Sequence, residues 1–145
     1  MSVQRAYLQE MLDLMWRDYL KAKRAMSAVR YVGQPSQSLT YLASPYTHAD
    51  KEVRRDRYMA ACKAAAKLML AGEVVFAPIA HSHPIEAYFD KNEGHDFWMR
   101  QDAPYLEACS KLVVLTIDGW DKSSGVAHEI RRAVERGIPI EYLAP

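Results

Sequence analysis

Four short apolar runs, separated by longer stretches with helical spacing, constrain the fold of this chain more than any other feature. The runs are SLTYLAS, EVVFAPI, KLVVLTI and IPIEYL. Strands covered on both faces need not alternate apolar and polar residues, and strands that alternate with helices are typical of parallel sheets. The pattern therefore predicts an α/β protein with a three-layer, doubly wound parallel sheet of about four to five strands, of the flavodoxin or Rossmann-like type.

Residues 4–29 precede these runs and contain neither Gly nor Pro. Their apolar side chains recur at helical spacing, which predicts an amphipathic helix. The segment YVGQPSQS that follows has the composition of a linker. We therefore expect a helical appendage with its linker at 1–36 and the α/β domain at 37–145. The helix could pack on its own chain or join subunits, and we expect a homodimer or a higher homo-oligomer.

Composition argues against several classes of function. The 145 residues carry 19 Lys and Arg against 18 Asp and Glu, so a net charge of +1 gives no field that favours nucleic acid or an acidic membrane. No apolar stretch is long enough for a membrane span, and no signal-peptide pattern is present, so we expect a cytoplasmic protein. Cys62 and Cys109 lack metal-type spacing, which favours two buried, reduced thiols.

In doubly wound sheets, ligands bind at the carboxyl ends of the strands, in the loops that follow them. These loops are 43–50, 77–96 and 118–125. The first contains Ser44, and the amides at the start of the next helix could bind an anion. A plain turn with Thr47 or Asp50 as the helix cap explains the same residues. The chain has neither a GxGxxG nor a GxxxxGK[ST] motif, so we expect no dinucleotide cofactor and no P-loop.

The second loop reads HSHPIEAYFDKNEGHD. Three histidines and an aspartate in it could bind zinc, but no cysteine and no helical HxxxH pair fixes a ligand geometry. These residues are His81, His83, His95 and Asp96. Histidines that hydrogen-bond the loop backbone or contact a substrate are the commoner case. We therefore expect no metal, with a zinc hydrolase kept as an alternative.

The stretch FWMRQDAPYLEACSKL places an aspartate on an otherwise apolar helix face. The residues of this face are Trp98, Asp102, Tyr105, Cys109 and Leu112. Inside a helix, Asp102 would be a partly buried acid with a raised pKa, as proton transfer requires. Alternatively, Pro104 begins the helix and Asp102 belongs to its cap region.

A second carboxylate, Glu129, lies near the start of the last helical stretch, GVAHEIRRAVERG. It comes too far after Ser123 and Ser124 to form a capping box. The core stripe that periodicity predicts is Val126, Ile130, Ala133 and Val134. Glu129 then lies on the flank of this stripe and is directed toward the strand ends. Alternatively, it is a rim residue paired with Arg132 or Arg136.

Two carboxylates that converge at the strand ends suggest glycosidic-bond chemistry, in which one acid attacks the sugar carbon and the other protonates the leaving group. A close pair gives retention through a covalent sugar ester, and a distant pair gives inversion by water. The sequence leaves the separation of the two groups open.

Three motifs, in the order YLASPYTH, RQDAPYL and GWDKSSGVAHE, resemble a known family from Leu39 to Pro145. They are similar to the nucleoside 2-deoxyribosyltransferase superfamily, which includes the 2'-deoxynucleoside 5'-monophosphate N-glycosidases, and most of all to a small branch with YLASPYTH and GWDxSxGxxxE motifs. The resemblance implies that Tyr41 is catalytic, with Glu129 as nucleophile and Asp102 as proton donor and acceptor for the base. The candidate substrate-binding residues are Ser44, Pro45, His48, His81, His83, Ser123 and Gly125. Among these, the serine of SxGxxxE contacts a 5'-phosphate in the nucleotide-hydrolysing branch, and the histidines are typical of the small branch alone.

We therefore expect an enzyme that cleaves or transfers the N-glycosidic bond of a (2'-deoxy)nucleoside or its 5'-monophosphate through a covalent glycosyl intermediate, without a cofactor. Its partner would be that small molecule, and neither nucleic acid nor a membrane. Two further alternatives stay open beside the zinc hydrolase. One is a non-catalytic nucleotide sensor on the same fold, and the other is an interaction domain that uses the N-terminal helix.

Overall fold

The computed structural model describes residues 11, 13–18, 20–21, 38–91 and 93–145. By its internal contacts the chain divides into Met1–Ser36 and Gln37–Pro145. The described residues of the first unit are helical, and the rest of the predicted helix and its linker lie outside the described residues. Among the described helices, none is both long and apolar enough to cross a membrane.

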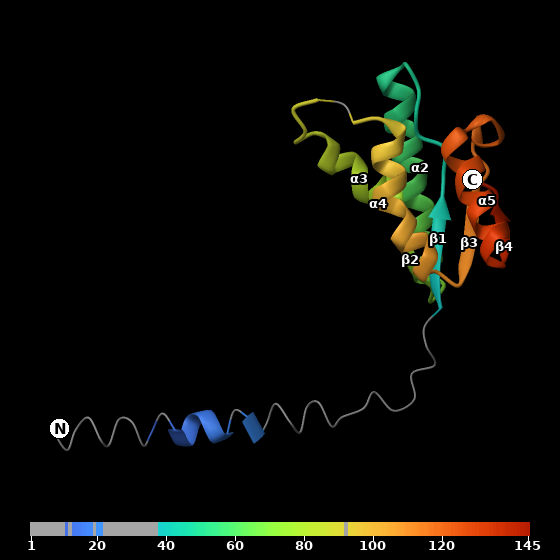
Figure 1. Ribbon diagram of the computed structural model, residues 1–145. Helices are drawn as coiled ribbons and strands as arrows, with labels where there is room; N and C mark the ends of the chain where they lie inside the picture. Colours follow the sequence, from blue (N-terminus) through green and yellow to red (C-terminus); the bar gives the residue numbers. More distant parts are fainter. Residues whose placement is uncertain (1–10, 12, 19, 22–37, 92) are drawn as a thin grey trace. The chain divides into compact units, whose positions relative to one another are not determined.

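The second unit is built on a four-stranded parallel sheet in the order β2-β1-β3-β4 (Figure 1). The strands are β1 (Leu39–Ala43), β2 (Val74–Phe76), β3 (Lys111–Leu115) and β4 (Ile140–Leu143). β1 and β3 are buried along nearly their whole length, as strands covered on both faces should be. From β1 the chain continues to β2 on one side of the sheet, and from β3 it continues to β4 on the other side, so the strand order switches between β1 and β3. The doubly wound α/β prediction is therefore confirmed, with four strands.

Helices cover both faces of this sheet. They are α2 (Lys51–Leu70), α3 (Pro78–Glu86), α4 (His95–Ala108) and α5 (Ser124–Arg136), with a 3₁₀ turn, η1 (Trp120–Lys122), before α5. One core cluster joins Tyr41 of β1 to Leu106 of α4 and Val126 of α5. A second cluster joins Leu42, on the opposite face of β1, to Ala64 of α2. Hence α4 and α5 form one layer, and α2, with α3 packed against it, forms the other.

Local chemistry explains where α2 and α3 begin. Asp50 precedes α2, and its Oδ1 accepts a hydrogen bond of 2.8 Å from the Glu52 amide, so Asp50 rather than Thr47 is the cap. The expectation of an uninterrupted loop at 77–96 is wrong, because α3 begins at Pro78. Proline is favoured in the first turn of a helix, where its missing N–H has no partner to lose. The motif HSHP therefore lies on a helix.

The start of α4 decides between the two interpretations of Asp102. The helix begins at His95, and Pro104 lies inside it, so the interpretation that Pro104 begins the helix is wrong. Asp102 lies within the helix and is only 8% exposed. The predicted apolar face is correct only in part, because α4 ends at Ala108 and Leu112 belongs to β3.

The buried face of α5 is rotated from the predicted stripe. Val126 and Ala133 are buried as predicted, but Val134 is 66% exposed and Glu129 only 6%. Because α4 packs against α5, the flank on which we expected Glu129 is covered. Glu129, which we expected on the flank of the core stripe, is therefore part of the buried face, and its carboxyl group lies in the protein interior.

Candidate active site

A cavity of about 1080 Å³ lies at the carboxyl ends of the strands. Its walls come from the loop after β1, the starts of α2 and α5, and the helices α3 and α4. The predicted site residues that line it are Ser44, His48, His83, Asp102, Ser123, Gly125 and Glu129. Three other predicted residues, Tyr41, Pro45 and His81, are not part of the lining.

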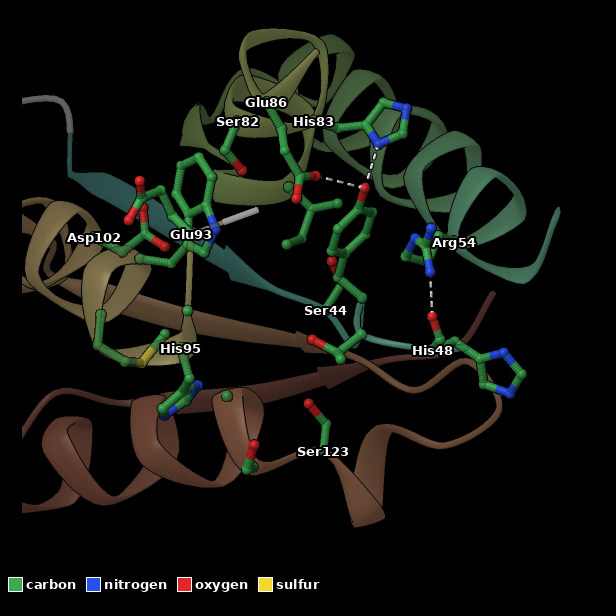
Figure 2. Close-up of a pocket in the computed structure, with 18 of the residues that line it drawn as sticks. Ser44, His48, Arg54, Ser82, His83, Glu86, Glu93, His95, Asp102 and Ser123 are labelled. Carbon is green, nitrogen blue, oxygen red and sulfur yellow. Dashed lines mark hydrogen bonds between the residues drawn. The ribbon is translucent and has the colours of Figure 1, made fainter. Parts of the chain in front are cut away.

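Figure 2 shows that the cavity is chemically uneven. Asp102 and Glu93 lie toward one end of the view, Arg54 lies toward the other, and Ser44 and Ser123 lie between them. Two carboxylates therefore lie toward one end of this view and a guanidinium group toward the other, with the carboxylate of Glu86 between them. A ligand with one neutral and one anionic end matches that arrangement.

Glu129 of α5 is held by Tyr41 of β1. The Tyr41 hydroxyl donates a hydrogen bond of 2.7 Å to Glu129 Oε1, and both side chains are buried. The alternative that Glu129 is a rim residue paired with an arginine is wrong, because no ion pair in the described part of the chain involves it. Arg132 instead contacts Glu107 and Glu135. Glu129 thus has a neutral donor beside it rather than a cation.

The protein interior shifts the pKa values of both carboxyl groups upward. Burial raises the pKa of Glu129 to about 8, opposed by the hydrogen bond from Tyr41 and reinforced by the Asp102 carboxylate. Burial raises the pKa of Asp102 to about 6. Burial and the Glu129 carboxylate raise the pKa of Tyr41 well above its ordinary value, so Tyr41 remains a donor. Between about pH 6 and 8 the two acids therefore share one proton.

Two serines bring hydroxyl groups to the cavity. Ser44 is 7% exposed, and its Oγ has no hydrogen-bond partner among the described residues. Buried hydroxyl groups nearly always have a partner, so an unpartnered one in a cavity wall marks a place for a ligand or water. Ser123 caps α5, because its Oγ accepts a hydrogen bond of 3.3 Å from the Val126 amide. Its own proton remains available to an acceptor. Pro45, beside Ser44, is fully buried.

The histidines of the HSHP helix have separate surroundings. Nδ1 of His83 lies 2.6 Å from the hydroxyl of Tyr46, and this hydroxyl donates its proton to Glu86 at 3.2 Å. His81 is exposed, and its ring lies against that of Phe76. Among the described residues, no group of three or more His, Cys, Asp or Glu could hold a metal ion. The zinc alternative therefore gains no ligand set from this part of the chain.

An arginine of α2 ties together the two loops that flank the strand switch. Arg57 donates to the carbonyl oxygen of Thr47 at 2.9 Å and to that of Asp118 at 3.2 Å. It passes so close to Gly119 that a Cβ there would lie 2.6 Å from Nη2, and Gly119 has a φ of +85°. The positive φ requires glycine at the start of GWD, and a Cβ there would also displace the end of the Arg57 side chain. His48, in the first of these loops, is exposed and accepts a backbone amide hydrogen bond of 3.0 Å.

Sequence reasoning did not identify several residues of the lining. Lys51, Arg54 and Lys122 add positive charge, and Trp98 adds a half-buried ring. Lys51 and Lys122 form no ion pair with any described residue. The basic residues lie within about a turn and a half of helix starts that follow strand-end loops. Their place near these helix starts was the one sequence feature that could have indicated that they line the cavity. The sequence places Trp98 on an apolar helix face, and this pattern does not distinguish a side chain packed in the core from one that lines a cavity.

Comparison with known proteins adds three findings. A family model described as "Domain of unknown function (DUF1937)" matches residues 38–144. Among solved structures, a 2-deoxyribosyltransferase from the psychrotolerant bacterium Bacillus psychrosaccharolyticus is similar, with a TM-score of 0.56 and 24% identity, covering 74% of this chain and 73% of that one. That enzyme is described as a biocatalyst for the synthesis of antiviral and antitumoral nucleosides. At this identity the likeness shows a shared fold. No curated protein matches the sequence.

Proposed function

This chain belongs to the family described as Domain of unknown function (DUF1937), and on that premise we propose that it cleaves or transfers the N-glycosidic bond of a (2'-deoxy)nucleoside or its 5'-monophosphate. The observation that carries the proposal is the buried pair of Glu129 and Asp102 in one cavity wall, with Tyr41 hydrogen-bonded to Glu129. The sequence motifs and the fold shared with a 2-deoxyribosyltransferase support it.

In the proposed reaction, Glu129 attacks C1' of the sugar while Asp102 protonates the departing base. The C1'–N bond breaks, an ester bond forms between C1' and Glu129, and the base leaves with the proton. Water or a second base then attacks C1' and displaces Glu129, and Asp102 accepts the proton of the attacking group. The hydroxyl of Tyr41 holds one carboxylate oxygen of Glu129, which leaves the other for the sugar carbon.

The reactive protonation state places the shared proton on Asp102 and leaves Glu129 ionised. With pKa values of about 8 and about 6, the reverse distribution is favoured by about two pH units, or roughly a hundredfold. A positively charged oxocarbenium-like sugar beside Glu129 favours the ionised carboxylate in the transition state. The proposal therefore predicts a bell-shaped pH profile with limbs near pH 6 and pH 8.

Three features of the lining support a phosphorylated substrate. The Ser44 hydroxyl has no partner, and Ser123 can donate at the start of α5, where backbone amides favour an anion. Lys51 and Lys122 also line the cavity. A 5'-phosphate placed among these groups would leave the base toward Asp102.

The test is chromatographic detection of free base after incubation with a panel of nucleosides and their 5'-monophosphates, with and without an acceptor base. Glu129→Gln should abolish base release, and Asp102→Asn should slow it by roughly 10²- to 10⁴-fold, as loss of a general acid does. Glu135→Gln is the matched control, because Glu135 is exposed on the same helix. Base release by Glu129→Gln at the wild-type rate would contradict the proposal.

A second candidate is a nucleotide sensor that binds without turnover. The pKa of about 8 for Glu129 favours it, because the carboxyl group is then mostly uncharged at neutral pH. Stabilisation by nucleotides in a thermal-shift panel, with no base released at any pH from 5 to about 10, would establish the sensor. Release of base would exclude it.

A further inference from the structure

We propose that Trp98 is the stacking platform for the base, an assignment that rests on the proposed function for the identity of its ligand. Trp98 and Asp102 are four residues apart on α4, and both line the cavity. One helical turn, about 5.4 Å along the axis, separates such positions on one helix face. A planar base whose ring nitrogen meets Asp102 can therefore lie against the indole of Trp98.

The indole is held in place before any ligand binds. The ring of Phe89 stacks on it with a centroid separation of 5.6 Å and an angle of 17°, and Phe97 meets it edge-on at 5.0 Å and 85°. Phe89 and Phe97 also contact each other edge-on at 5.8 Å. Since Phe89 occupies one face of the indole, a base would stack on the opposite face. A platform that is already ordered loses little conformational entropy on binding.

Packing against Phe89 and Phe97 does not by itself account for the place of Trp98 in the cavity wall. It belongs to neither buried core cluster, whereas Trp120 packs against the core and against Tyr142. Trp98 is half-buried, and its exposed part contributes to the cavity wall. An ordered ring in that position offers surface to a planar ligand rather than filling the interior.

The charges along the cavity favour the same placement. Asp102 and Glu93 lie toward one end of the view in Figure 2, and Arg54 lies toward the other. An anionic sugar phosphate is attracted by Arg54 and repelled by Asp102 and Glu93, so it leaves their end to the uncharged base, while Glu86, between the two ends, accepts a hydrogen bond from Tyr46. Trp98 is one turn from Asp102 and therefore lies at the base end.

The test uses tryptophan emission, because the chain contains three tryptophans that can be replaced separately. In the double variant Trp16→Phe/Trp120→Phe, emission comes from Trp98 alone. We expect free adenine and free cytosine to quench this emission saturably, and deoxyribose 5-phosphate, which has no ring, to leave it unchanged. Equilibrium dialysis with labelled adenine measures the affinity independently of emission.

Trp98→Leu should weaken adenine binding by roughly 5- to 150-fold, the range expected when one base–aromatic stack is lost, and Trp98→Phe should weaken it less. Trp120→Phe is the matched control and should bind adenine as the wild type does. If Trp98→Leu fails to fold, as judged by circular dichroism, then Trp98→Phe and the emission of the double variant decide. Unchanged Trp98 emission at saturating adenine, unchanged affinity in Trp98→Leu, or no binding of either base overturns the assignment.

These measurements separate failure of the platform from failure of the enzyme. If the wild type releases no base yet adenine quenches Trp98, the glycosidic reaction is wrong and the stacking site stands. If base is released and Trp98→Leu has wild-type KM and kcat, the reaction stands and the stacking site is wrong.

Discussion

Tyr41→Phe removes a single oxygen from the proposed site and leaves the packing around it almost unchanged. Tyr41 is fully buried, and its ring meets that of Phe76 at a centroid separation of 5.8 Å, a contact that phenylalanine can also make. The hydroxyl that is lost donates the 2.7 Å hydrogen bond to Glu129 Oε1. The substitution therefore tests that bond rather than the fold.

The size of the effect follows from the strength of the bond. A hydrogen bond to a charged group contributes about 1.5–3 kcal/mol, and each 1.4 kcal/mol is about a tenfold change in rate. Because the bond lowers the pKa of Glu129, its loss should raise that pKa from about 8 by roughly one to two units. The ionised form of Glu129 then becomes rarer, and kcat/KM should fall by roughly 10- to 150-fold.

The assay is the rate of base release against pH for the wild type and for Tyr41→Phe. We expect the alkaline limb to move upward and the acid limb, which reports Asp102, to stay near pH 6. Tyr142→Phe is the control, because Tyr142 is exposed and contacts Trp120 instead of Glu129. A rate within about twofold of the wild type, with an unmoved alkaline limb, would refute the reasoning.

Three further predictions concern stability and substrate binding. The pKa of Glu129 is about 8 in the folded protein and 4.5 in an unfolded chain, so between about pH 4.5 and 8 only the unfolded chain ionises, and the free energy of unfolding falls as pH rises. Glu129→Gln removes this effect and should therefore raise Tm more at pH 9 than at pH 5. The corresponding difference in unfolding free energy is on the order of a few kcal/mol. Ser44→Ala should leave urea stability within roughly 0.5 kcal/mol, because no protein partner is lost, while raising KM for a 5'-monophosphate more than for the nucleoside. Gly119→Ala should lower the free energy of unfolding by about 1–3 kcal/mol in urea titrations, because Gly119 has a φ of +85° and a Cβ there would meet Arg57. Gly94→Ala is the control and should have a smaller effect, because a Cβ at Gly94 has nothing within 4 Å.

The sheet could be predicted from the sequence because it depends on local patterns. Each apolar run is long enough for one covered strand, and the helices between runs require parallel pairing. α3 escaped prediction because its few apolar residues, interrupted by two histidines and Pro84, show no helical periodicity. Its start at Pro78 was the one local signal of a helix.

The site was harder to predict because its geometry depends on packing between elements. The sequence identified Glu129 and Asp102 as candidates, but periodicity could not distinguish a stripe through Val134 from one through Glu129. The packing of α4 against α5 determines which of the two stripes is buried, and local sequence periodicity contains no information about this tertiary contact. The cavity role of Trp98 depends in the same way on where Phe89, from another segment, places its ring.

The burial of Glu129 is unfavourable for folding alone, and this bears on what the position is for. The residue occupies a stripe position beside Val126 and Ala133, where an apolar side chain would bury surface without desolvating a carboxyl group. No cation among the described residues pairs with it, and the hydrogen bond from Tyr41 only partly opposes the rise in its pKa. Asp102, buried on the facing helix, adds repulsion whenever both groups ionise. Two such groups opening into one cavity lower stability at neutral pH, and strongly shifted acids in a cavity are typical of sites that transfer protons or bind sugar carbons. A protein that needed these positions only for folding would be more stable with phenylalanine at 41 and leucine at 129, so the loss of stability is itself an argument for chemistry at this site.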